Sequence, residues 1–209
     1  MEARAHAAPA PAPGPERWPA ISAASDEYRR VVASGTWRQE RPALVRAVTE
    51  LGEGYWVMTP LARDDGTTVL VNRGFVPAEK RDPAAWAAPR SAGAVTVTGL
   101  LRMSEPGGGF LRSNEPAADR WYSRDVGAIA ATHGMAEAAP YFIDAERVPG
   151  ETGLPVAGLT VLSFSNNHLV YALTWAILAM MAAAGAIFVH IEVLWPGRLR
   201  TPREGPQIS

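Results

Sequence analysis

The spacing of hydrophobic positions changes between the first part of the chain and its last third. Up to about residue 165, short runs of alternating apolar and polar residues repeat, a period typical of strands with one buried face. From Leu169 to Val189, 21 consecutive residues carry no charge. A helix of that length, at ~1.5 Å per residue, reaches roughly 30 Å, the thickness of a bilayer's hydrocarbon core. The pattern predicts a β-rich domain followed by a transmembrane helix.

Within the first part, the pattern predicts antiparallel strands with little helix. The most clearly marked feature is a β-hairpin whose turn, Ala62 to Gly66, contains Asp-Asp-Gly, residues that accept left-handed backbone angles. A short helix is expected over Ser123 to Thr132, with Ser123 as its cap and Gly134 as its stop. The expected strands are 27–36, 54–61, 67–75, 94–102 and 140–146. The predicted fold class is mainly antiparallel β (α+β) with a C-terminal transmembrane helix.

These patterns divide the chain into four parts. Residues 1–24, rich in Ala and Pro, predict an unstructured lead, and 25–165 form the β-rich domain. Residues 166–193 form the transmembrane helix, which puts the chain in a lipid bilayer, and 194–209 a disordered tail. Arginines follow the helix but do not closely precede it, so the tail is expected in the cytoplasm and the domain on the extracytoplasmic side. Those arginines are Arg198, Arg200 and Arg203.

The N-terminal lead does not explain how the domain would cross the membrane. It contains no apolar stretch of the length that a signal peptide or first span needs. Two explanations remain: an earlier helix is missing from the sequence, or the domain is exported by its only span. The first is preferred, and it predicts an upstream hydrophobic segment in frame.

Composition excludes several kinds of chemistry. The chain has no cysteine, which rules out disulfides, thiolate metal sites and thiol catalysis. A net charge of -1 gives no reason to expect nucleic-acid binding. The four histidines are too far apart in sequence for a zinc site on one element, and no nucleotide-binding or serine-nucleophile motif occurs.

His168, at the mouth of the apolar helix, is a candidate ligand. On a helix it shares one face with Tyr171 and Trp175, so an imidazole stands beside an aromatic wall that could receive a planar macrocycle. Imidazole is an axial ligand for heme iron, and a helix N-terminus with Asn166 or Asn167 nearby favours anionic propionates. The alternative, an interfacial histidine bonded to loop backbone, is equally compatible with the residues alone.

Arg73 is the second candidate, because it interrupts an apolar strand just before Gly74. An arginine near a core needs a partner, and a structural ion pair or bonds to carbonyls at the Gly74 bend are favoured over ligand contact. A rival interpretation makes the chain a single-span membrane enzyme that uses Arg73 with Asp125 or Asp144. No arrangement of base and nucleophile is legible in the sequence, so this ranks lower.

Six segments, in order, resemble the surfeit locus protein 1 family of membrane-bound assembly factors for cytochrome c oxidase. The resemblance runs from about Tyr28 to about Ala179, and the combination of the second and the last segment is highly specific. The segments are GYWVMTPL, DGTTVLVNRGFVP, TGLLR, EPGGGFLRSNEP, RWYSRD and NNHLVYALTWAILA.

The resemblance implies a non-enzymatic role in oxidase biogenesis, as a factor or chaperone that supplies heme A to subunit I. Heme A synthase then becomes a further expected partner, and His168 the expected ligand of the heme iron. Other residues match motif positions whose roles the motif does not define: Arg73, Gly74, Trp121, Tyr122, Asn166 and Asn167. A structural chaperone that never touches heme stays as an alternative.

Departures from the family pattern also appear. Phe75 stands where a Trp is usual, Val170 stands where a Gln is common, and the family's first helix is lacking from the sequence. A heme site between two helices would then lose one wall. The Ala/Arg-rich composition, with a single lysine, favours a bacterial plasma membrane as the location.

Overall fold

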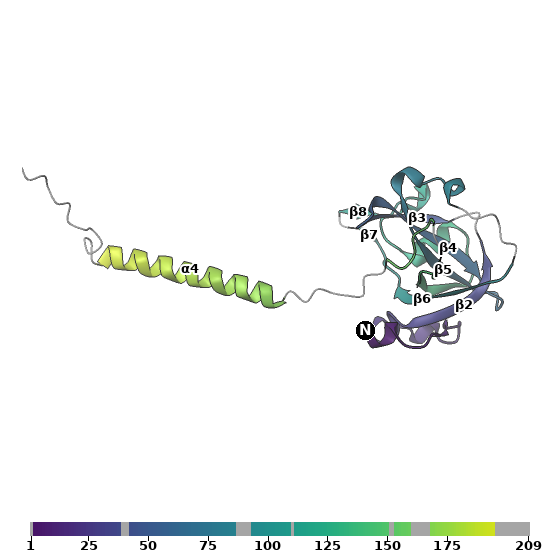
Figure 1. Cartoon of the computed structure of the whole chain (residues 1–209), viewed down its shortest axis with the longest axis horizontal. Helices are drawn as coiled ribbons and strands as arrows, with labels where there is room; N and C mark the ends of the chain where they lie inside the picture. Colours follow the sequence, from purple (N-terminus) through teal and green to yellow (C-terminus); the bar gives the residue numbers. More distant parts are fainter. Residues whose placement is uncertain are drawn as a thin grey trace, which may run out of the picture. The chain divides into compact units, whose positions relative to one another are not determined.

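The computed structural model describes residues 2–38, 42–86, 93–109, 111–150, 153–159 and 168–194. The chain divides into two units, Met1–Leu162 and Ser163–Ser209. The first unit carries all of the strands, and the second carries one long helix, α4 (His168–Leu194) (Figure 1).

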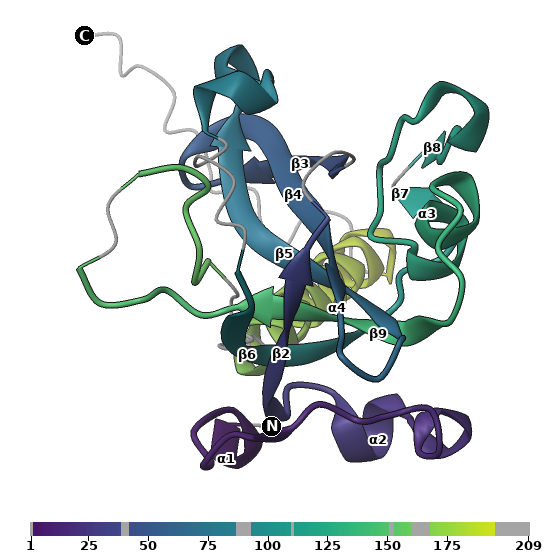
Figure 2. The same ribbon diagram turned by 90° about the vertical axis from the view of Figure 1, so that its right-hand side faces the viewer.

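Five strands of the first unit close into a barrel (Figure 2). Around the barrel the order is β2, β6, β9, β5 and β4, and a short pairing of β2 with β4 closes the ring. The pairing of β5 with β9 is parallel, while the other pairings around the ring are antiparallel, so the sheet is mixed; the predicted β-rich class is confirmed. The bounds are β2 (Arg30–Trp37), β4 (Gly52–Ala62), β5 (Thr68–Pro77), β6 (Val95–Met103) and β9 (Ala138–Ala145).

Counted along the chain, the five barrel strands follow one another around the ring as first, second, third, fifth and fourth. This is the Greek-key arrangement of the OB-fold barrels, a fold that serves many functions. The barrel therefore positions residues without indicating an activity.

The remaining elements decorate the barrel. The edge strand β3 (Ala43–Thr49) extends the sheet beside β4, and β1 (Ala10–Pro11) pairs in parallel with β2. A separate small hairpin joins β7 (Gly108–Gly109) to β8 (Arg112–Ser113). The short helices are α1 (Glu2–Ala5), η1 (Trp18–Ala20), α2 (Ala23–Asp26), η2 (Ala78–Lys80), η3 (Pro83–Ala85), η4 (Pro116–Ala118) and α3 (Val126–Thr132).

The hairpin predicted at 62–66 is present and is held by its own turn. Asp65 accepts hydrogen bonds from the Thr67 backbone N–H at 2.9 Å and from the Thr67 hydroxyl at 2.6 Å. Gly66 takes a φ of 83°, which side chains with a Cβ rarely adopt. The turn chemistry therefore fixes the register of β4 against β5.

Alternate residues of the barrel strands fill its interior. On β5, Val69 and Val71 point inward and Leu70 points outward, as the two-residue period requires. The interior cluster takes residues from all five barrel strands: Val31, Ala33, Leu61, Val69, Val71, Leu101, Ala139, Tyr141 and Ile143. These side chains leave the barrel solid, as in other small barrels.

A second cluster covers one outer side of the barrel. Leu70 and Phe142 pack there against Val126 and Ile129 of α3. Asp125, not Ser123, caps this helix, because its side chain accepts the Ala128 N–H at 3.1 Å.

The chain leaves the helix at Gly134, as expected, with a φ of 63°. The side chain of Ser123 serves elsewhere, donating to the Glu105 carbonyl at 2.6 Å. The boundary of the helix therefore differs from the predicted one at its N-terminal end alone.

The first residues of the chain fold against the barrel, which differs from the predicted unstructured lead. Ala12 belongs to the barrel's interior cluster, and the Tyr141 hydroxyl donates to the Pro13 carbonyl at 2.8 Å. In Figure 2, α1 and α2 lie below β2. Small side chains let this segment approach the barrel closely, and proline carbonyls still accept hydrogen bonds.

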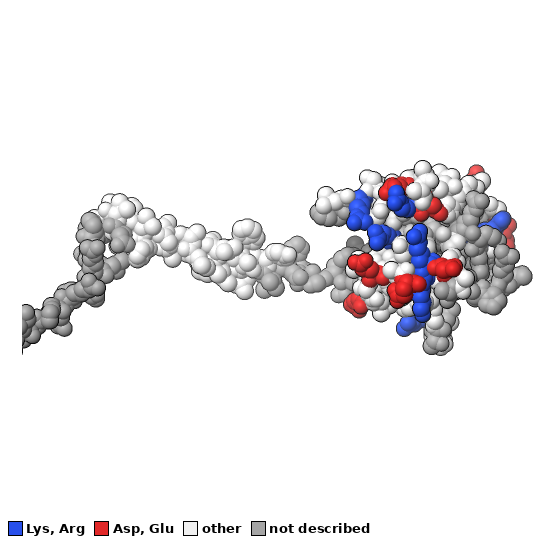
Figure 3. All heavy atoms as spheres, turned by 90° about the horizontal axis from the view of Figure 1, so that it is seen from above, with Lys and Arg blue, Asp and Glu red and all other residues white. Residues whose placement is uncertain are grey.

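Helix α4 begins at the predicted histidine and continues past the predicted end. Its segment Tyr171–Ile191 has 21 residues and a mean hydropathy of 2.1, long and apolar enough to cross a membrane. Its described side chains include no Lys, Arg, Asp or Glu and appear white in Figure 3, whereas the face of the β domain seen there mixes both signs of charge. The helix fits a membrane anchor. Asn166, Asn167 and the predicted tail lie outside the described residues.

Candidate functional site

The candidate heme site lies at the first turns of α4. The helix starts at His168, and Tyr171 and Trp175 follow it three and seven residues later, exposed by 66% and 69%. The predicted face is therefore open around its two aromatic side chains. Among the described residues, no group of three or more His, Cys, Asp or Glu side chains could hold a bare metal ion. A heme group would need only one imidazole from the chain, and His168 is the candidate for it.

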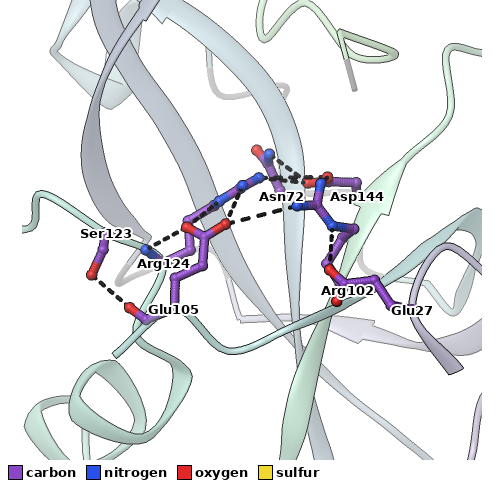
Figure 4. Close-up of polar contacts among 7 residues, drawn as sticks. All are labelled: Glu27, Asn72, Arg102, Glu105, Ser123, Arg124 and Asp144. Carbon is purple, nitrogen blue, oxygen red and sulfur yellow. Dashed lines mark hydrogen bonds and ion pairs between the residues drawn. The ribbon is translucent and has the colours of Figure 1, made fainter. Parts of the chain in front are cut away.

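A buried polar cluster lies at the other candidate motifs, in the barrel unit (Figure 4). Its centre is Asp144 on β9, a carboxylate that is only 3% exposed. It accepts hydrogen bonds from Asn72 Nδ2 at 2.8 Å, Arg102 Nη1 at 3.0 Å and Arg124 Nη1 at 3.2 Å. Three donors from three different segments thus satisfy one buried charge, which would be costly if it were unpaired.

Both arginines of this cluster also stack on an aromatic ring and bind a second carboxylate. Arg102 lies 4.6 Å from the centre of the Tyr28 ring and donates to Glu27 at 3.1 Å. Arg124 lies 4.7 Å from the centre of the Phe142 ring and donates through Nε to Glu105 at 3.0 Å. A planar guanidinium stacks on rings and forks to carboxylates at once, which a lysine ammonium cannot do.

Asn72 links this cluster to the bend at Gly74. Its side-chain oxygen accepts the Gly74 N–H at 3.1 Å, while its amide nitrogen donates to Asp144. Gly74 has a φ of 127°, and a Cβ there would lie 2.3 Å from the Val156 carbonyl oxygen. The next residue, Phe75, exchanges two backbone hydrogen bonds with Val156 at 3.0 and 2.8 Å. The Asn-Arg-Gly-Phe segment therefore needs its asparagine and its glycine for structural reasons.

The charges of the cluster support one another. Burial alone would raise the pKa of Glu105, but the hydrogen bonds and charge of Arg124, with the charge of Arg102, outweigh it and hold that pKa below its usual range. For Arg124, burial acts to lower the pKa, and bonds to Glu105 with the charge of Asp144 raise it overall. Glu105 and Arg124 are therefore held in their charged forms, and their ion pair ties the loop after β6 to the segment that precedes α3.

Arg73 lies outside this cluster, although the sequence suggested a place near the core. Because side chains alternate along β5, Asn72 is buried and Arg73 points to the opposite side, where its guanidinium lies 5.2 Å from the centre of the Trp37 ring. Arg73 lines a groove of about 610 Å³ together with Trp37, Trp86 and Arg147. At the Gly74 bend itself, Asn72 Oδ1 accepts the Gly74 N–H.

The two aromatic motif residues have different environments. Trp121 is 1% exposed, packs in the outer cluster and donates from Nε1 to Asp119 at 2.6 Å, which is a structural role. Tyr122 is half-buried, and the Arg112 guanidinium lies 5.5 Å from its ring centre. Only Tyr122 is placed to contact something beyond the domain.

The carboxylates of the rival enzyme hypothesis are used structurally. Asp125 caps α3, and Asp144 is bound by two arginines and Asn72. Arg73 stacks over Trp37. Within the described residues, these three groups therefore stabilise separate parts of the fold.

Reasoning from the sequence missed the Asp144 cluster. Its members lie in segments that the sequence marks as motifs or strands, but the sequence does not show that their polar residues contact one another. These segments are VLVNRGFVP, TGLLR, EPGGGFLRSNEP, RWYSRD and PYFIDAE. A usable signal existed, because Asp144, Arg102 and Asn72 each interrupt an apolar strand. Buried polar residues on several strands have to find one another.

The motifs that meet at Asp144 also agree with a known family. The model of the SURF1 family matches residues 1–180. The chain belongs to the surfeit locus protein 1 family.

Individual members of the surfeit locus protein 1 family resemble the chain over most of the β domain. Surfeit locus protein 1 of Mus musculus is 38% identical over 139 residues, which cover 66% of this chain and 44% of that protein. A SURF1-like protein of Monosiga brevicollis is 35% identical over 179 residues, covering 78% and 67%. The Homo sapiens protein is 38% identical over 123 residues, covering 58% and 40%. The chain thus spans less than half of the mouse and human proteins.

Proposed function

We propose that the chain is a membrane-anchored assembly factor for cytochrome c oxidase. The observation that carries this proposal is the family match over residues 1–180, which extends from the barrel into the apolar helix. The cluster at Asp144 supports a scaffold, since its carboxylates and arginines bind one another. The role is one of biogenesis and not of catalysis.

At the helix, the chain handles heme A on its way to oxidase subunit I. Heme A would supply an iron centre for which an imidazole of the chain would be a ligand. His168 is the ligand, while Tyr171 and Trp175 support the ring plane. The free amides of the helix N-terminus, with Asn166 and Asn167, favour the propionates. Heme A synthase is the partner that supplies the heme.

The β domain lies on the extracytoplasmic side of a bacterial plasma membrane, with the C-terminus in the cytoplasm. This orientation rests on the arginines after the helix, which resist translocation. A protease added to intact spheroplasts would remove the domain and leave the tail. Protection of the domain would reverse the orientation.

The test of heme binding is an absorption spectrum of the full chain purified from cells that make heme A. The wild type is expected to carry a Soret band that His168→Ala abolishes. His190→Ala is the matched control, because it removes the other histidine of α4 at the opposite end of the helix. A band that survives His168→Ala would exclude the ligand assignment.

Oxidase activity in a deletion strain separates assembly from heme handling. Low oxidase activity that the His168→Ala variant restores fully would leave a structural chaperone for oxidase subunits. Normal activity in the deletion strain would contradict the assembly role itself.

A further inference from the structure

Exposed large apolar side chains gather at one place on the barrel unit. In the part of this unit that the structure describes, four such residues are exposed, and three of them lie on two hairpins. Val48 (81% exposed) and Leu51 (52%) lie at the β3–β4 turn, and Leu111 (88%) lies at the β7–β8 turn. The fourth, Val148, lies in the groove beside Arg73. Scattered exposed residues are normal, but such a concentration indicates a contact.

Leu111 is placed unfavourably in two ways. Its φ of 58° is left-handed, which an ordinary side chain adopts at a cost and which glycine adopts freely. Its side chain also stands almost entirely in water. Gly107 and Gly108 earlier in the same loop take φ values of 95° and 127°, so glycine is used at two other positions with positive φ. Both the backbone conformation and the exposure of this leucine are unfavourable for folding. A contact with something outside the domain would explain why a leucine stands there.

The two hairpins border the same hollow, which has a volume of about 290 Å³. Arg46, Val48 and Tyr55 line it from the β3–β4 side, and Arg112 and Tyr122 from the other. Each tyrosine is stacked by an arginine, Arg112 over Tyr122 and Arg81 over Tyr55, with 5.5 Å to the ring centre in both pairs. Glu53 also lines the hollow, so its lining carries two positive charges and one negative charge.

We propose that these two hairpin turns, the tip surface, dip into the headgroup region of an anionic phospholipid bilayer. The tip surface consists of Val48, Leu51 and Leu111 with the flanking Arg46, Arg112, Tyr55 and Tyr122. Apolar tips enter the acyl boundary, while tyrosines and arginines stay at the headgroups, where their mixed character suits them. The arginines contact lipid phosphates.

A bilayer fits better than a protein as the occupant. The chain itself carries the apolar helix α4, which begins nine residues after Leu159, so a membrane is always within reach of the domain. Two narrow turns offer three protruding side chains and no broad apolar face, whereas a stable protein interface needs about 800 Å² on each partner. Glu50, exposed between Val48 and Leu51, opposes contact with an anionic surface. Replacement of Glu50 therefore tests whether removal of a negative charge strengthens binding to an anionic bilayer.

The experiment uses the full chain in vesicles and depends on the absence of cysteine. Leu111→Cys and Val48→Cys each provide one labelling site for an environment-sensitive fluorophore, and Thr96→Cys, exposed on β6, is the control. In phosphatidylcholine vesicles containing phosphatidylglycerol, labels at 111 and 48 are expected to shift to the blue and to be quenched by nitroxide-bearing lipids. The label at 96 should do neither. Unchanged unfolding midpoints establish that the variants are folded.

Charge variants then test the contact with phosphate. Arg112→Gln should lower the ratio of docked to free domain by about fivefold, the order expected for one basic charge near an anionic surface, and Glu50→Gln should raise it. High salt or pure phosphatidylcholine should weaken docking. Labels at 111 and 48 that behave like the label at 96 would overturn the proposal, as would shielding that appears only when oxidase subunits are added. None of these readouts depends on heme.

Discussion

The barrel unit and helix α4 deal with charge in opposite ways. The barrel buries Asp144 and surrounds it with Arg102, Arg124 and Asn72, so that its charge is matched where it lies. Helix α4 carries no charge between Leu169 and Val189, because nothing in a bilayer could match one. Neither region tolerates an unpaired charge. The barrel brings partners to a charged residue from distant positions in the sequence, whereas a single helix in a bilayer brings none.

The strongest test of this comparison removes the central carboxylate of the barrel. Asp144→Ala leaves two buried guanidinium groups without their common acceptor and should lower the free energy of unfolding by about 3–5 kcal/mol. Urea unfolding of the full chain in detergent measures this. Asp64→Ala, in the exposed turn, is the control and should change stability by less than about 0.5 kcal/mol. Equal effects of the two variants would mean that the cluster adds no stability.

The second test places a charge in the helix. Ala182→Arg, near the middle of Tyr171–Ile191, should make insertion less favourable by about 2.5–3.5 kcal/mol, because an arginine at the centre of a bilayer has no partner. Carbonate extraction of membranes would find more of the variant in the soluble fraction. The same change at the exposed Ala117 should leave membrane association as it was. Retention of both variants would contradict a single-span anchor.

A third, smaller effect depends on acid. The pKa of Glu105 is lower in the folded protein than the ordinary glutamate value of 4.5, so the stability it adds is present above that value and is lost as the pH falls through the folded pKa. Glu105→Gln should cost about 1 kcal/mol at neutral pH, discounted because the side chain is partly exposed. The gap to the wild type should close in acid. Glu79→Gln gives the baseline for a fully exposed glutamate.

The smallest effect is expected from Tyr141, whose hydroxyl donates to the Pro13 carbonyl. Burial raises the pKa of Tyr141 to about 12 from 10.0, so the stability that its neutral phenol adds is present below 10.0 and is lost as the pH rises through about 12. Tyr141→Phe should cost about 1 kcal/mol at neutral pH, because Trp18 still donates to the Pro13 carbonyl. Alkaline unfolding monitored by tyrosinate absorbance tests this. Tyr122→Phe is the control, and an equal alkaline dependence in both variants would exclude Tyr141 as its source.

Local signals in the sequence identified the elements whose stability is local. The hairpin at 62–66 and helix α4 were predicted because their turn chemistry and apolar run are continuous in sequence. Strand β3 was not predicted, since its Ala, Leu and Arg residues suit a helix as well, and pairing with β4 decides its conformation. The order of the N-terminal residues likewise comes from the barrel that they contact.

The site shows the same division. His168 could be singled out because it adjoins a recognisable helix. The partners of Asp144 could not, because Asn72 lies 72 residues away, and Arg102 and Arg124 lie 42 and 20 residues away. Each of these residues alone is compatible with an exposed position. Only the barrel topology brings them together, and that topology depends on the parallel pairing of β5 with β9.

The pairing of early strands with late strands also sets the order of events during synthesis. Strand β2 waits for β6, and β5 waits for β9, so the barrel cannot close until residue 145 has left the ribosome. The first 140 residues therefore exist for a time as a chain with unpaired strand edges, the state most exposed to aggregation and proteolysis.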